Sequence, residues 1–215
     1  MKRMFALLLC IILVLGLFVG CNKDAADSTT TAATEASTEP AEPAGKLYLS
    51  FGPTLEVVYD EAGNVLEITG INESGKTIAA ESVDLLGRGC VFAARKFLRY
   101  ASDNKLLGDA KDMVVRVGNG DPLPTEDFLG TIVTDCQYLA DEECTGIQLM
   151  QLNEDDLGAD GNILPATAKS LAARFLGVEE AQVTGDDNIV DGAYIYTNGD
   201  TSCAVDAFTG LVTKK

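Results

Sequence analysis

Residues 52–77 read GPTLEVVYDEAGNVLEITGINESGKT, and this stretch decides the fold of the chain. Residues 54–59 carry apolar side chains at every second position, and residues 64–69 are rich in β-forming residues, so both segments are predicted to be strands. The link at residues 60–64 is charged and contains a glycine, as reversing turns do. We therefore expect an antiparallel hairpin, followed by a second turn at residues 72–75.

Eight residues of this stretch form an ordered pattern: a proline, a short residue, an apolar-Glu-apolar strand, a glycine turn, a second strand, and an Asn followed by an acid and a glycine. They are Pro53, Thr54, Glu56, Gly63, Val65, Asn72, Glu73 and Gly75. The pattern resembles the extracellular domain of RsgI-type anti-sigma factors and related secreted proteins of Gram-positive bacteria. The resemblance implies an α+β domain over about residues 46–152.

The residue before Pro53 departs from that family, because Gly52 stands where the family has Asn. The family is associated with self-cleavage of its Asn-Pro bond, and glycine has no side-chain amide to attack its own carbonyl. The sigma-binding segment and spanning helix of the family are also missing from the sequence. We therefore carry over the fold and not the anti-sigma role, and self-processing at the Gly52-Pro53 bond stays an alternative.

Residues 70–77, GINESGKT, satisfy the P-loop spacing G-x4-GK[ST] between a strand and an expected helix. A P-loop is backed by a buried parallel sheet, whereas the preceding strand here is half polar and is expected to pair in a hairpin. No apolar strand ending in a Walker B Asp is evident either. Nucleotide binding through Gly70, Lys76 and Thr77 is a second alternative, and we expect no cofactor.

The N-terminus has the pattern of a lipoprotein signal peptide over residues 1–20. A basic start precedes an apolar run at residues 4–19, and residues 18–21, FVGC, resemble a bacterial lipobox. Cys21 would be lipidated and become the first mature residue. Residues 21–45 form the expected disordered tether, because residues 22–45 contain no Leu, Ile, Val or aromatic residue. The predicted location is the extracellular face of a Gram-positive-type cell membrane.

The charge of the chain is strongly acidic, with 16 basic and 33 acidic side chains and a net charge of −17. Loss of residues 1–20 removes Lys2 and Arg3 but no acid, so the mature chain is still more negative. This negative charge disfavours nucleic acid and anionic lipid as partners.

The chain has no histidine, so histidine-based catalysis and His-ligated metal sites are absent. We expect no catalytic residue and no metal. The calcium-like run at residues 156–161 lacks ligands at its third and twelfth positions, so we interpret it as a solvated linker.

Two further helices and two strands complete the expected first domain. The helices span residues 83–100 and 126–140, and the strands span residues 113–117 and 147–152. The expected order is ββαβαβ, an open mixed sheet with two helices. In the first helix we place Val83, Leu86, Cys90, Ala94, Phe97 and Leu98 inward and Arg88, Arg95, Lys96 and Arg99 mostly outward.

A boundary rich in acids and glycine at residues 153–162 begins the C-terminal module, residues 153–215. Residues 165–176 have a helical pattern that ends at Gly177. Strands at residues 193–197 and 202–206 are joined through an Asn-Gly-Asp turn. The last part, with Val205-Asp206 and Thr209-Gly210, resembles the end of a PepSY domain over about residues 163–215. This resemblance implies an αβββ binding or inhibitory module.

Four cysteines, Cys90, Cys136, Cys144 and Cys203, remain as an even set once Cys10 leaves with the signal and Cys21 is lipidated. We favour a Cys136–Cys144 disulfide, provided that the chain turns at residues 141–143. Cys90 and Cys203 would then have to meet across the boundary, although any of the four can instead remain a buried thiol.

The sequence as a whole predicts a non-enzymatic, lipid-anchored binding or sensory and regulatory lipoprotein. Its partners would be the membrane, through the N-terminal lipid, and a protein, peptide or envelope-polymer ligand. The alternatives are the self-processing or nucleotide-binding protein and a structural envelope spacer.

Overall fold

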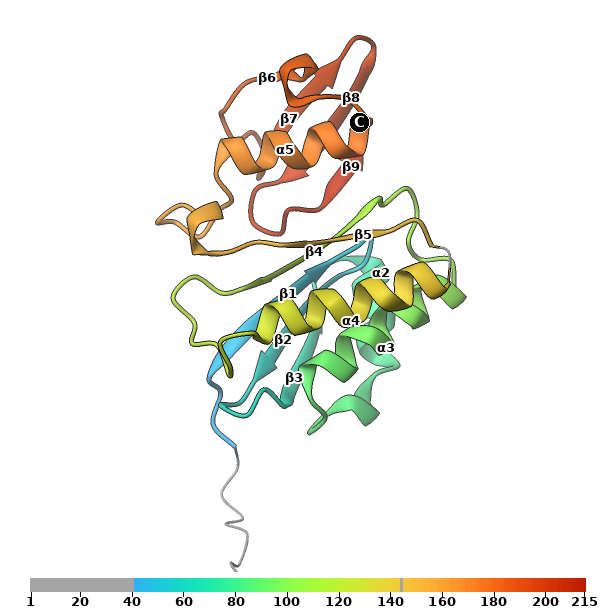
Figure 1. Cartoon of the computed structure of the whole chain (residues 1–215), viewed down its shortest axis with the longest axis vertical. Helices are drawn as coiled ribbons and strands as arrows, with labels where there is room; N and C mark the ends of the chain where they lie inside the picture. The colour runs from blue at the N-terminus through green and yellow to red at the C-terminus, as the bar shows by residue number, and fades with distance from the viewer. Residues whose placement is uncertain (1–40, 144) are drawn as a thin grey trace, which may run out of the picture. The chain divides into compact units, whose positions relative to one another are not determined.

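The computed structural model describes residues 41–143 and 145–215, which form an α+β fold with two sheets (Figure 1). The first sheet has five strands in the order β3-β2-β1-β4-β5. They are β1 (Gly45–Ser50), β2 (Thr54–Tyr59), β3 (Val65–Gly70), β4 (Asp112–Val117) and β5 (Gln148–Gln151). Its helices are α2 (Glu73–Ala80), α3 (Cys90–Asp103) and α4 (Phe128–Glu142).

The second sheet is antiparallel and has four strands in the order β6-β7-β8-β9. They are β6 (Thr184–Gly185), β7 (Ala193–Asn198), β8 (Thr201–Asp206) and β9 (Val212–Lys214), and helix α5 (Pro165–Leu176) packs on them. Short 3₁₀ turns lie at Val83–Leu85, Glu154–Asp156 and Glu180–Gln182. Among the described residues, no helix is both long and apolar enough to cross a membrane.

The predicted β2–β3 hairpin is confirmed. The two strands pair antiparallel with Val57 opposite Ile68, and the alternating residues Leu55, Val57 and Tyr59 are buried. The turn is fixed by Asp60, whose carboxylate accepts hydrogen bonds from the backbone N–H groups of residues 62 and 64 at 2.9 and 2.8 Å.

The central strand of the first sheet, β1, was not predicted. It pairs antiparallel with β2 on one side and β4 on the other, whereas β4 and β5 pair in parallel. Residues 47–50 are buried on both faces of the sheet, so this segment has no apolar-polar alternation to reveal it. The observed order of the first sheet is therefore βββααβαβ and not ββαβαβ.

The prediction of one helix over residues 83–100 was wrong at its start, and residues 72–75 begin helix α2 instead of forming a free turn. Gly87 has a φ of +76° and its N–H donates to the Val65 carbonyl, so the loop pairs with β3 and cannot be helical. Val83 and Leu86, which were placed inward, are 66% and 47% exposed.

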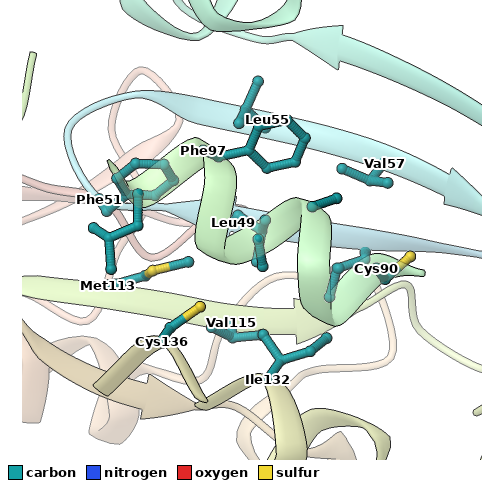
Figure 2. Close-up of a cluster of buried hydrophobic side chains, with 14 of the residues drawn as sticks. Leu49, Phe51, Leu55, Val57, Cys90, Phe97, Met113, Val115, Ile132 and Cys136 are labelled. Carbon is teal, nitrogen blue, oxygen red and sulfur yellow. The ribbon is translucent and has the colours of Figure 1, made fainter. Parts of the chain in front are cut away.

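The first core lies between the five-stranded sheet and helices α3 and α4. Figure 2 shows side chains from β1, β2, β4, α3 and α4 converging in it. The labelled ones are Leu49, Phe51, Leu55, Val57, Cys90, Phe97, Met113, Val115, Ile132 and Cys136. The predicted inward positions of Cys90, Ala94, Phe97 and Leu98 on α3 are confirmed.

The second core lies between α5 and the four-stranded sheet. Helix α5 spans the predicted residues 165–176 and ends at Gly177, whose φ of +71° is the left-handed conformation expected of a glycine C-cap. The β7–β8 hairpin forms where its Asn-Gly-Asp turn predicted it. The hydroxyl of Tyr194 donates to the Ile163 carbonyl at 2.8 Å, which ties the sheet to the segment before α5.

Strand β4 contributes to both cores. Met113 and Val115 belong to the first, and Val114 between them belongs to the second, because successive strand side chains point to opposite faces. Arg174 of α5 pairs with Asp112 at 2.7 Å, and the ammonium of Lys111 donates to the Phe175 carbonyl. The C-terminal module therefore covers the face of β4 that the helices α3 and α4 leave free.

Candidate functional site

Some residues of the RsgI-like pattern, which we call the family-like residues, hold the start of helix α2 against the start of strand β2. The side-chain oxygen of Asn72 accepts hydrogen bonds from the Gly75 N–H at 2.8 Å and the Thr54 N–H at 3.0 Å. Its amide nitrogen donates to the Gly52 carbonyl at 2.8 Å. Asn72 thus caps α2 and holds the start of β2 against it. A Cβ on Gly75 would lie 2.1 Å from the Thr54 carbonyl oxygen, so this contact requires glycine.

The other family-like residues also have structural surroundings. Glu56 accepts from the Lys46 ammonium and the Tyr48 hydroxyl, both at 2.9 Å. Gly63 lies in the β2–β3 turn with a φ of +78°, and Val65 is buried in the first core.

The Gly52-Pro53 bond lies where a side chain at position 52 has no room. Gly52 has a φ of +95°, and a Cβ there would lie 2.6 Å from the Leu107 carbonyl oxygen. The Asn nucleophile of the resembling family would not fit this backbone. The geometry therefore offers no support for self-processing.

The P-loop-like residues do not form a phosphate cradle. The N–H groups of Gly75 and Lys76 are occupied by the Asn72 side chain and the Asn72 carbonyl, both at 2.8 Å. The Lys76 ammonium pairs with Glu73 at 2.6 Å in an exposed position. Among the described strands β3 pairs only with β2, in antiparallel fashion, and the parallel pair of β4 and β5 lies at the other end of the sheet, so no parallel sheet backs this loop.

The cysteines Cys90, Cys136 and Cys203 are buried free thiols. Burial raises the pKa of Cys90 and of Cys136 to about 12, and that of Cys203 to about 11. Cys90 lies in the first core and Cys203 in the second, so the structure does not bring these two together, and both have the alternative form of a buried thiol.

The structure has Cys136 as a free thiol and so gives no support to the Cys136–Cys144 disulfide; Cys144 itself, like Cys21, lies outside the described residues. The turn at residues 141–143 on which the disulfide depended is not present, since α4 continues to Glu142 and is capped by Glu143. Within the described residues no cluster of acids, His or Cys could hold a metal. In the calcium-like run, Asp160 accepts from the backbone and side chain of Asn162 instead.

A groove of about 530 Å³ opens between α3 and α4, and it is the best candidate for a binding site. Among its lining residues on α3, four lie at helical spacings of three and four: Phe92, Arg95, Lys96 and Arg99. Gly89, Val91, Asp135 and Leu139 complete the lining. Phe92 is 49% exposed, so an aromatic ring lies at the surface beside three cationic groups.

The cations of the groove are only partly neutralised. Arg95 Nη1 lies 3.4 Å from Asp135 Oδ1, and Arg99 Nε lies 2.8 Å from Glu143 Oε1. These pairs are solvent-exposed, and such pairs are worth about 0–1 kcal/mol. Lys96 forms no ion pair with a described residue, and its ammonium lies 5.4 Å from the Phe92 ring centroid.

The groove is a basic region on an acidic chain. Residues 88–102 contain Arg88, Arg95, Lys96 and Arg99 but no Asp or Glu, whereas the chain as a whole has a net charge of −17. The sequence placed these cations on the outer face of a helix but did not identify a site. The missing signals were the exposure of Phe92 and the position of α4, which forms the second wall.

In comparisons with known proteins, no family model and no curated protein matches the chain.

Proposed function

We propose that the chain is a non-enzymatic binding lipoprotein of a Gram-positive-type envelope, with the groove between α3 and α4 receiving an acidic peptide segment of a protein partner. The proposal rests on one observation: three cationic side chains and the exposed ring of Phe92 line the same groove. Guanidinium groups bind carboxylates directionally, and apolar walls bind the side chains between them. The contacts of Arg95 and Arg99 with Asp135 and Glu143 support this chemistry, since carboxylates already approach both groups.

An acidic peptide fits the groove better than a phosphate-rich envelope polymer. The lining includes Val91, Phe92 and Leu139, which would have no partner on a chain of glycerol phosphates. The negative charge of the rest of the molecule would repel an extended polyanion, whereas a short acidic segment meets only the basic face.

Membrane attachment is the second part of the proposal and is supported by the signal-peptide pattern and the lipobox-like residues before Cys21. We expect the mature protein to begin at a lipidated Cys21 and to partition into detergent. Intact-mass measurement tests this. A Cys21→Ser protein that remained lipidated would contradict it.

The groove is tested with a short fluorescein-labelled peptide that alternates glutamate and leucine. We expect saturable binding that weakens at least about tenfold, or 1.4 kcal/mol, in the variant R95Q/K96Q/R99Q. The matched control K76Q/K214Q/K215Q removes the same charge from exposed positions outside the groove and should change the affinity by less than about twofold.

Two outcomes would overturn the proposed peptide ligand. Equal loss of affinity in both triple variants would mean that only overall charge matters. Displacement of the peptide by poly(glycerol phosphate), with the polymer binding more tightly than the peptide, would assign the groove to an envelope polymer.

A further inference from the structure

Arg116, on β4, is the largest fully buried side chain of the described residues and is 1% exposed. It lies directly opposite Tyr48 of β1, which in turn lies opposite Glu56 of β2. This row crosses the sheet on the face that the C-terminal module covers. A buried guanidinium is costly unless it is paired and hydrogen-bonded. Its partners therefore decide what Arg116 does.

Aromatic rings cover the guanidinium. Its central carbon lies 5.1 Å from the Tyr48 ring centroid and 4.3 Å from that of Phe208, in the turn between β8 and β9. The two rings also contact each other edge to face at 5.0 Å. These cation–π contacts stabilise the charge, but they supply no hydrogen-bond acceptor.

Only one edge of the guanidinium has a partner. Nη1 donates to the Gly161 carbonyl at 2.8 Å, whereas Nε and Nη2 are buried and have no hydrogen-bond partner among the described residues. The Nε–H and Nη2–H bonds are the two parallel donors that bind both oxygens of a carboxylate or phosphate side-on. The same edge binds a carboxylate elsewhere in this chain, because Arg174 donates from Nε and Nη2 to one oxygen, Asp112 Oδ1, at 3.1 and 2.7 Å.

The nearby carboxylates are already engaged. Glu56 accepts from Lys46 and Tyr48. Asp206 Oδ1 accepts from the N–H groups of Phe208 and Thr209 and from the Thr209 hydroxyl, at 3.1, 2.6 and 2.7 Å. Arg116 forms no ion pair with any described residue. Burial lowers its pKa from the ordinary value, but a guanidinium remains charged in proteins.

We propose that the Nε–Nη2 edge of Arg116 binds one small oxyanion, a carboxylate or phosphate group, beneath the turn that carries Phe208. A water molecule could satisfy the same two donors but would leave the buried positive charge uncompensated. The burial of Arg116 requires a small ligand or the terminal group of a larger one. Phe208, which is 38% exposed and whose ring lies against the guanidinium, covers Arg116 on the outer side. This site is independent of the groove between α3 and α4.

The experiment follows the Nε–H resonance of Arg116 in ¹⁵N-labelled protein, assigned by comparison with the R116K variant. Sodium acetate and sodium phosphate are titrated separately at constant ionic strength maintained with sodium chloride. We expect a saturable downfield shift with at least one of them. Acetate alone identifies a carboxylate ligand, phosphate alone a phosphate ligand, and both together a general oxyanion site.

Variants locate the response. R116K keeps the positive charge but has no Nε–H, so its response is read from the backbone amide of Phe208, whose ring lies against the guanidinium in the wild type; in R116K that amide should lose the saturable shift. R174K, which removes the matched fork paired with Asp112, should retain it. F208A removes the covering ring and should bind with faster exchange, so it tests the site even if R116K does not fold. The proposal is overturned if neither oxyanion shifts the resonance, if chloride alone gives the same shift, or if R116K responds like the wild type.

Discussion

At the scale of single residues, Asn72 has the largest structural task among the family-like residues. One amide group caps α2 and fixes the backbone of residues 52 and 54. Its three shortest hydrogen bonds, at 2.8 to 3.0 Å, are to backbone groups, and longer contacts join it to the Thr54 and Ser74 hydroxyls at 3.5 and 3.4 Å. These contacts explain the position of Asn72 by its role in folding.

The variant N72A tests this role. Loss of a side-chain N-cap costs about 1 kcal/mol, and each partly buried backbone group left without a partner adds about 1 kcal/mol or more. We expect the free energy of unfolding to fall by about 2–3 kcal/mol in urea titrations. The control N104A removes an exposed amide that bonds only the Tyr100 carbonyl and should change stability by less than about 0.5 kcal/mol. Equal losses of stability in the two variants would contradict the claim that Asn72 stabilises the contact between α2 and the start of β2.

The buried thiols should make the free energy of unfolding fall as the pH becomes alkaline. Cys90 and Cys136 have folded pKa values of about 12, above the ordinary value of 9.0. The folded state then holds its protons more tightly than the unfolded state. Their contribution is complete below about pH 9 and is lost as pH rises toward 12, at up to about 1.4 kcal/mol per pH unit for each thiol.

Two measurements check the thiol prediction. Urea unfolding at pH 8 to 11 should show stability falling above pH 9, with a shallower fall in C90A/C136A. Cys90, Cys136 and Cys203 should resist a thiol reagent at pH 8 in the folded protein and react fully in denaturant. Rapid labelling of any of the three in the folded state would show that it is not buried.

At the scale of elements, the parts that were predictable are those with local chemistry of their own. The β2–β3 hairpin has an alternating pattern and an Asp turn, and α5 has a glycine cap at Gly177, so both could be placed from sequence. Strand β1 could not, because its burial on both faces depends on helices and a C-terminal module that are distant in sequence. The start of α3 depended on the pairing of the Gly87 loop with β3.

The candidate sites also combine features that the local sequence indicates with features that depend on distant parts of the chain. The cations of α3 were visible as a polar helix face, but the groove exists only because α4 packs beside it. Arg116 gave no signal, since a single Arg in a short apolar strand resembles an edge residue. Its burial results from Phe208 and Gly161, which lie more than forty residues away in the chain.

The junction between the turn after β1 and the loop after α3 gives a prediction about the Gly-Pro bond. In G52N, which restores the family's Asn, the side chain would meet the Leu107 carbonyl on a backbone with φ of +95°. We expect stability to fall by about 2 kcal/mol or more and the chain to remain uncleaved by intact-mass measurement. The control G108N lies at φ of +58° in open space and should cost about 1 kcal/mol or less. Cleavage after residue 52 in G52N would restore the self-processing hypothesis.

At the scale of the whole molecule, charge sets two responses of opposite sign. The net charge of −17 produces self-repulsion that favours the unfolded chain, whereas the basic groove attracts an acidic ligand through the same long-range field. The Debye length falls from about 30 Å at 0.01 M salt to about 8 Å at 0.15 M. Salt therefore weakens both the repulsion and the attraction.

We accordingly expect sodium chloride to stabilise the fold while it weakens binding of the acidic peptide. Between 0.01 and 0.15 M salt, stability should rise on the order of 1 kcal/mol, which corresponds to about 2–4 °C in Tm for a chain of this size. The dissociation constant of the peptide should rise over the same range. The variant E61Q/E142Q/D187N removes three exposed acids that form no ion pair with any described residue, so its Tm should depend less on salt. A Tm that is independent of salt, together with salt-independent peptide binding, would mean that local contacts outweigh the overall charge in both properties.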